Sequence, residues 1–175
     1  IKGVLGFDNS SLAFIDMGME GGVEFSQVKG ALNFTESTLT ARDIRAMLLG
    51  EAVEVDVTTQ AGQQNAFRFE ARGKADSQAL AQHFKWPLFN YFKGESSWLA
   101  TLRVADSEKG VPGAILRIES LLKGMDITLP VPLNKSAAQP RELVIEVALP
   151  FTANTIFNVK YADFFKSAFN VKNNV

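Results

Sequence analysis

The chain has 175 residues, no cysteine, and a formal net charge of −1 from 18 basic and 19 acidic side chains. This composition is typical of a globular protein, and it excludes disulfides, thiolate metal sites and the basic stripe that nucleic-acid binding requires. With 46% hydrophobic residues the chain can bury a substantial core, and no apolar run is long enough to span a bilayer as a helix.

One spacing of glycine, leucine and phenylalanine occurs twice, over residues 3–12 and 30–39. In each copy an alternating segment is interrupted by four polar residues, at 8–11 and at 35–38. Alternation of period two is typical of a strand with one apolar face, so each copy predicts a β-hairpin. The repetition predicts an array of such hairpins in one extended sheet. Because the chain opens at Ile1 within this pattern, we expect an internal fragment of a larger protein.

Alternation continues through the rest of the chain and predicts further strands. We expect them at residues 23–28, 31–34, 37–46, 51–59, 66–72, 97–105, 114–122, 142–149, 156–161 and 165–171. Short turns between neighbouring strands predict antiparallel pairing in a meander. The closely spaced prolines of residues 130–140 predict an irregular segment. We interpret residues 1–22 as the end of a preceding hairpin repeat and residues 23–171 as the main sheet, within a single β-rich segment that spans 1–175.

One helix is predicted, beginning at Asp76 or Ser77, either of which can act as N-cap, and ending before Pro87. Leu80 and Phe84 lie four residues apart on one face, which is enough to dock a short helix on the edge or end of a sheet. The predicted class is therefore mostly β, a curved antiparallel sheet with one or two short flanking helices.

No constellation of residues predicts catalysis. His83 is the only histidine, and we interpret it as a surface or helix-face residue. Glu54 and Asp56 form an acidic pair on one strand, which is more typical of a solvated face than of acid–base chemistry. Ser96 and Ser97 lack the spacing of a nucleophile elbow, and no glycine-rich phosphate loop is present. We expect no enzymatic activity, no metal and no cofactor; a cluster of buried carboxylates would revive an enzyme hypothesis.

The apolar residues of successive strands form a series of matching faces, and these are the candidate site. The series is Val53, Val55, Val57, Phe67, Phe69, Trp98, Leu102, Val104, Leu116, Ile118, Leu143, Ile145 and Val147. Two interpretations stay open. The faces form a closed protein core, as in a β-sandwich, or they line a concave groove that holds acyl chains at about 0.8 kcal/mol per buried methylene.

Three motifs point to a family. Residues 39–50 (LTARDIRAMLLG) match an L-x-A-x-x-I-x-A-x-x-L-G element, and residues 94–98 match a G-x-x-x-W strand entry. Residues 129–135 (LPVPLNK), preceded by the S-x-L-x-G of 120–124, match an LPxPLxK segment. In this order and spacing they resemble the AsmA-like family of large bacterial proteins, and its YhdP branch in particular.

The resemblance implies a protein that is anchored in the inner membrane of a Gram-negative bacterium and extends across the periplasm. It implies repeated β-grooves that carry phospholipid between the inner and outer membranes, and thereby a contribution to outer-membrane biogenesis, lipid homeostasis and barrier function. The partners implied are phospholipid acyl chains and neighbouring groove repeats of the same chain, with membrane contact made only by parts outside this fragment. The family implies no catalytic residues, so the thirteen apolar residues are a hypothetical groove lining. The alternative is a structural or scaffolding β-sandwich module with a closed core and no lipid.

Overall fold

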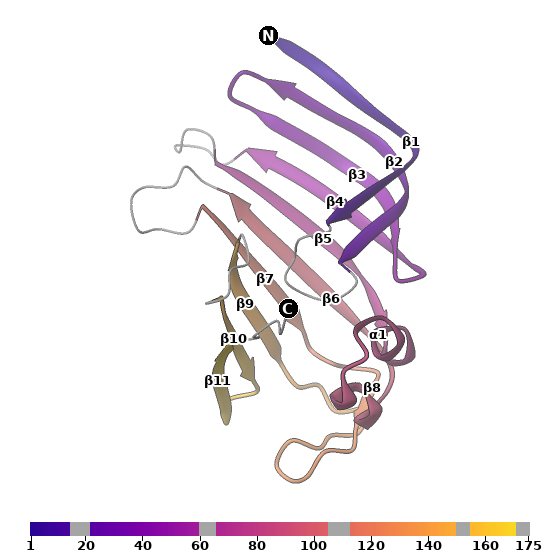
Figure 1. Ribbon diagram of the computed structural model, residues 1–175, viewed down its shortest axis with the longest axis vertical. Coiled ribbons are helices and arrows are strands. Elements are labelled where there is room, and N and C mark those ends of the chain that lie inside the picture. Colours follow the sequence, from indigo (N-terminus) through magenta and orange to yellow (C-terminus); the bar gives the residue numbers. More distant parts are fainter. Residues whose placement is uncertain (15–21, 60–65, 105–112, 150–154, 171–175) are drawn as a thin grey trace.

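A single antiparallel sheet dominates the computed structural model, which describes residues 1–14, 22–59, 66–104, 113–149 and 155–170 (Figure 1). The strands are β1 (Lys2–Phe14), β2 (Val23–Thr35), β3 (Leu39–Leu48), β4 (Glu51–Thr59), β5 (Phe67–Asp76), β6 (Phe92–Val104), β7 (Ala114–Ser120), β8 (Met125–Ile127), β9 (Leu143–Leu149), β10 (Ile156–Tyr161) and β11 (Phe165–Asn170). Strands pair in chain order, except that the short β8 pairs with β6 and β9 therefore follows β7. The predicted class and the meander are confirmed.

The two copies of the repeated pattern fold differently. Residues 35–38 form the predicted turn between β2 and β3. Residues 8–11 do not form a turn, so the prediction of a first hairpin within residues 3–12 is wrong. They lie inside β1, which pairs with β2 on both sides of a register shift. Asn9 has a φ of +54°, a conformation that asparagine tolerates, so a β-bulge replaces the expected turn.

Bulges in three neighbouring strands bend one side of the sheet. Asn9 in β1, Gln27 in β2 and Asp43 in β3 all have positive φ, and each lies at a shift in register with the next strand. Figure 1 shows β1 and β2 bending so that their ends near residues 14 and 23 cross in front of the middle of the sheet. The bulge at Asp43 thus lies inside the strand that alternation predicts at residues 37–46.

A side chain of β4 stabilises the bulge in β3. The backbone N–H of Asp43 donates a hydrogen bond of 3.1 Å to Oδ1 of Asp56. This hydrogen bond, with the Arg72 guanidinium 2.8 Å from the other carboxylate oxygen, holds the pKa of Asp56 below its ordinary value. The bulge thus gives its unpaired N–H a charged acceptor.

Helix α1 (Ser77–Phe84) follows β5 and contacts β5 and β6. Oδ1 of Asp76 accepts hydrogen bonds from the N–H groups of Gln78 and Ala79, at 2.9 and 3.1 Å, which confirms the predicted N-cap. The helix ends because Lys85 adopts a left-handed conformation, and Pro87 begins a 3-10 helix, η1 (Pro87–Tyr91).

Residues 121–142, between β7 and β9, contain a second small core that alternation did not predict. Its buried side chains are Leu122, Met125 and Ile127 of this segment and Tyr161 of β10. The side chain of Lys135 lies among them, 4% exposed, and its Nζ donates hydrogen bonds to the carbonyls of Leu122, at 2.8 Å, and Met125. Burial lowers the pKa of this ammonium group, while Asp126 opposes the shift. Lys135 thus ties its own part of the segment to the turn at residues 122–125.

Candidate functional site: an apolar face across the sheet

All thirteen residues of the predicted lining project from the same side of the sheet, here called the apolar face. The strand registers place them in four cross-strand rows. These are Val53–Gly73–Trp98–Ser120–Leu143; Val55–Ala71–Ala100–Ile118–Ile145; Val57–Phe69–Leu102–Leu116–Val147; and Thr59–Phe67–Val104–Ala114. Because side chains alternate along each strand, residues in register share a face throughout. The structure therefore brings the whole predicted set together.

The apolar face extends beyond the predicted set into the first three strands. Ala41 pairs with Val57 and Ile44 pairs with Val55, so the rows continue across β3. Sequence reasoning missed these residues because the bulge at Asp43 reverses the alternation within β3. Following the alternation separately before and after Asp43 would have assigned Ala41 and Ile44 to the apolar face.

The side chains of this face are packed to different degrees along the sheet. A buried cluster is formed by Val28, Ala41, Ile44, Ala46 and Val57, with Val28 only 1% exposed. On β5 to β7 the predicted lining residues are half-buried, and β7, β9 and β10 contact principally their neighbours in the sheet. The apolar face is therefore filled by protein near β2–β4 and less covered toward β7.

A glycine makes room for the largest side chain on this face. Trp98 lies opposite Gly73, and a Cβ at Gly73 would meet Cζ2 of the indole at 3.2 Å and the carbonyl oxygen of Ala52 at 3.0 Å. The absence of a side chain at Gly73 therefore leaves the space that the edge of the Trp98 indole occupies.

The opposite side of the sheet, here called the charged face, carries cross-strand ion pairs. Arg72 lies 3.0 Å from Glu54 and 2.8 Å from Asp56, which confirms that the acidic pair of β4 belongs to an exposed face. The hydrogen bonds that Arg72 donates to Asp56 and Glu54 raise the pKa of its guanidinium. Such exposed pairs contribute little to stability, but they fix which side of each strand faces water.

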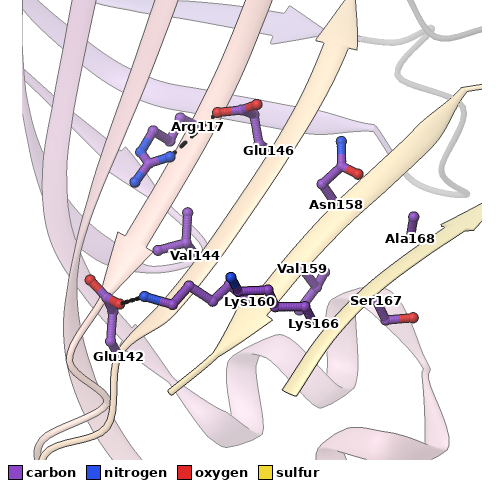
Figure 2. A pocket seen from close by; sticks show the side chains of 10 residues that line it. All are labelled: Arg117, Glu142, Val144, Glu146, Asn158, Val159, Lys160, Lys166, Ser167 and Ala168. Atoms are coloured by element: carbon purple, nitrogen blue, oxygen red, sulfur yellow. Dashed lines mark hydrogen bonds and ion pairs between the residues drawn. The ribbon is translucent and has the colours of Figure 1, made fainter. Parts of the chain in front are cut away.

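A shallow hollow of about 460 Å³ lies on the charged face over β7, β9, β10 and β11. Figure 2 shows Val144 between two ion pairs, Arg117–Glu146 at 3.4 Å and Lys160–Glu142 at 2.6 Å. Its lining is mixed in charge and open to solvent, so it resembles a depression between side chains rather than a binding cavity for an apolar ligand.

The remaining candidates for chemistry have structural surroundings. Nε2 of His83 lies 2.9 Å from the carbonyl oxygen of Gly22, and Ser96 Oγ lies 3.2 Å from Ser120 Oγ. Among the residues that the structure describes, no group of His, Asp and Glu side chains is gathered as a metal site would require. Nor is any described helix both long and apolar enough to cross a lipid bilayer.

Comparison with protein families gives a match that covers almost the whole chain. The family described as "YhdP protein" matches residues 1–174. Searches of curated proteins and of solved structures give no match.

Proposed function

This chain belongs to the YhdP family, and from that premise we propose that it is a segment of a lipid conduit. In this proposal phospholipid moves between the inner and outer membranes of a Gram-negative bacterium, with its acyl chains against the apolar face and its headgroup in water. The chain would lie in the periplasm as part of a protein anchored in the inner membrane, beside neighbouring groove repeats. It would act without a cofactor and without catalysis.

The observation that supports this proposal is the continuity of the apolar face across the sheet. Four rows of side chains in register run from β4 to β9. A hydrocarbon chain needs only contact with apolar surface, which stabilises it by about 0.8 kcal/mol per buried methylene and imposes no directional requirement. Transfer from one row to the next therefore changes the binding energy little, as movement along a conduit requires.

The test of lipid binding is native mass spectrometry of the purified chain. We expect co-purifying phospholipid, and we expect Val55→Asp and Phe69→Glu to remove it, because an unpaired carboxylate in an apolar site costs several kcal/mol of desolvation. Thr58→Asp is the matched control, since it adds the same charge to β4 on the charged face, where Thr58 is exposed. In the full-length protein, the two apolar-face variants should be expressed but should fail to complement a null strain.

A structural module is the second candidate, and the buried cluster around Val28 favours it. If the purified chain carries no phospholipid, and if the charged variants of the apolar face complement as well as Thr58→Asp, the face is a protein core and the conduit proposal is wrong.

A further inference from the structure

One end of the molecule combines exposed apolar side chains with a local excess of positive charge. This end, here called the η1 end, consists of residues 84–94, which include η1, and residues 121–141, which include β8. Figure 1 shows η1, β8 and the loop after β8 together at the end opposite the N-terminus. The two ranges are joined directly, because β6 pairs with β8 and the Thr128 N–H donates a hydrogen bond of 2.9 Å to the carbonyl of Tyr91.

Large apolar side chains of the η1 end are exposed to solvent. Trp86, Leu88 and Tyr91, in and directly before η1, are 42%, 48% and 47% exposed, and Val131 in the loop after β8 is 82% exposed. These four residues lie outside the strands, so they do not belong to the apolar face of the sheet. Tryptophan and tyrosine combine an apolar ring with a polar tip, which suits the boundary between water and hydrocarbon.

The exposed indole of Trp86 rests on an ordered base. Its ring stacks on Phe89, with centroids 6.0 Å apart and an interplanar angle of 6°. Phe89 meets Phe92 edge-on at 5.9 Å, and Phe92 packs against the second small core around Leu122 and Met125. Because the ring is already held in place, its burial against a partner costs little conformational entropy.

The charge of the η1 end is opposite in sign to that of the whole chain. Its two ranges contain five basic side chains and one acidic side chain, a net charge of +4, whereas the chain carries −1. Lys85, Lys93 and Lys123 are exposed, and within the part of the chain that the structure describes none of them has an ion-pair partner. The carboxylates that border the two ranges, Glu95 and Glu142, are already paired with lysines of β5 and β10. The positive charge therefore faces solvent and suits an anionic partner.

The residue types favour a membrane surface over a protein partner. Protein–protein interfaces are enriched in arginine and depleted in lysine, but the three exposed cations of the η1 end are all lysines. Lysine beside tryptophan and tyrosine is typical of the headgroup layer of a membrane. There the ammonium group reaches anionic headgroups while the ring enters the boundary with the acyl chains.

We propose that the η1 end binds the surface of an anionic phospholipid bilayer, with Trp86, Leu88 and Tyr91 at the headgroup boundary and the three exposed lysines at the phosphates. β6 begins at Phe92 in this end and carries Trp98 on the apolar face six residues further, which is about 20 Å along a strand. A bilayer held here therefore lies beside the apolar face. The inference goes beyond the proposed conduit, since the family resemblance implies membrane contact only by parts outside this chain.

Vesicle sedimentation tests the contribution of charge. We expect the purified chain to bind vesicles of phosphatidylethanolamine and phosphatidylglycerol, and to bind vesicles of phosphatidylcholine much more weakly. Lys85→Gln with Lys93→Gln should lower the affinity for the anionic vesicles about 25-fold, since each lysine near an anionic surface contributes a factor of about five. Lys2→Gln with Lys29→Gln is the matched control, because it removes the same charge from exposed positions of β1 and β2. Equal affinities of the two double variants, or no binding by the unmodified chain, would overturn the proposal.

Tryptophan fluorescence tests the contact of the apolar side chains. The chain has two tryptophans, so Trp98→Phe leaves Trp86 as the only one. Its emission should shift to shorter wavelength on the anionic vesicles and shift back in about 1 M salt, where the screening length is about 3 Å. Leu88→Ser should weaken vesicle binding, whereas Val4→Ser, at an exposed position of β1, should not. An emission that vesicles leave unchanged would refute the placement of Trp86 at the headgroup boundary.

The membrane contact and the conduit can fail separately. Phospholipid that co-purifies on the apolar face is detected without vesicles and stays bound in about 1 M salt, so it reports on Trp98 and not on the η1 end. If the chain carries phospholipid but binds no vesicle, the membrane contact fails and the conduit stands. If it binds vesicles but carries no phospholipid, the conduit fails and the membrane contact stands. A chain that binds no vesicle but dimerises, and that Trp86→Ala returns to a monomer, would assign the η1 end to a second copy and overturn the proposal.

Discussion

Replacement of Lys135 by methionine tests whether the buried ammonium holds the segment between β7 and β9 together. The Lys135 Nζ binds the carbonyls of Leu122 and Met125, and the backbone of Lys135 pairs with Ile127 in both directions, at 2.9 and 3.0 Å. Methionine keeps the length and the backbone pairing but removes both donors. The substitution therefore isolates the contribution of the ammonium group.

The expected loss is about 2–4 kcal/mol of unfolding free energy. Each of the two carbonyls that lose a partner inside the small core costs about 1–2 kcal/mol, because the new side chain gives nothing in return. Burial of the ammonium group carries a desolvation cost, which lowers the pKa of Lys135 and disappears in the methionine variant. This gain offsets part of the free energy lost with the two charged hydrogen bonds, so the expected net loss is smaller than the strength of those bonds. For a chain of this size, the loss corresponds to a fall in Tm of about 4–16 °C.

Urea unfolding followed by circular dichroism measures this effect. Lys123→Met is the matched control, because Lys123 is exposed in the same segment, and it should unfold at the wild-type urea concentration. Hydrogen exchange of residues 121–142 should accelerate in Lys135→Met and not in the control. Equal midpoints for the two variants would refute the reasoning, since the buried ammonium would then have no net stabilising effect.

Three further outcomes follow from the geometry. The hydrogen bond from the Asp43 N–H lowers the pKa of Asp56 from its ordinary value of 3.8. The ionised Asp56 therefore stabilises the folded chain above pH 3.8, and this stabilisation is lost as the pH falls through the lower folded-state pKa. Asp56→Asn should make Tm less dependent on pH in acid, and an unchanged dependence would contradict this reasoning. Gly73→Val should cost about 1–3 kcal/mol in urea unfolding, because its side chain meets the indole of Trp98 and a carbonyl, and a neutral result would show that the indole moves freely. Brominated phospholipid should quench the fluorescence of Trp86→Phe, which keeps Trp98 on the apolar face, more than that of Trp98→Phe; the reverse order would place lipid elsewhere.

Alternation predicted the strands best where both faces have a clear character. The bounds of β4 agree with the predicted 51–59, because Val53, Val55 and Val57 face inward while Glu54 points to water. Where a strand extends beyond its alternating residues, the predicted strand is shorter than the observed one. β6 begins at Phe92 instead of residue 97, because its first residues pair with β8. The local sequence around residues 92–96 gives no sign of this pairing.

The two polar tetrads show why turns and bulges are hard to separate in sequence. Residues 8–11 and 35–38 are both rich in turn formers, and each follows the same alternating pattern. The difference arises from pairing, since β2 is long enough to pair with β1 on both sides of residues 8–11. A turn at residues 8–11 would have removed the pairing of residues 12–14 with β2. Local preference allows a left-handed residue at Asn9, and the neighbouring strand decides whether the chain reverses there.

The candidate face was predictable, but its contacts outside the sheet were not. Each of the thirteen residues could be assigned from period two alone, because one alternating face per strand is all that the rows require. Lys135 and His83 carry no comparable signal. A lysine is more typical of an exposed surface, and a lone histidine on a short helix is usually solvated. Their partners are backbone carbonyls, which every residue has, so sequence cannot identify them.

Some side chains of the apolar face are buried by other protein side chains and others are exposed, and this unevenness favours a conduit over a sandwich. A closed sandwich would bury the apolar side chains of neighbouring strands alike, yet Leu12 of β1 is 43% exposed while Val28 of β2 is 1% exposed. Packing is therefore tight around Val28 and Val57 and again at Val147 of β9, which is 3% exposed, and looser on β5 to β7 between them. A closed core would cover the residues of β5 to β7 as fully, whereas a path for acyl chains requires apolar surface that protein leaves uncovered. If brominated phospholipid fails to quench Trp98, in the middle of this less covered region, the closed module becomes the better description.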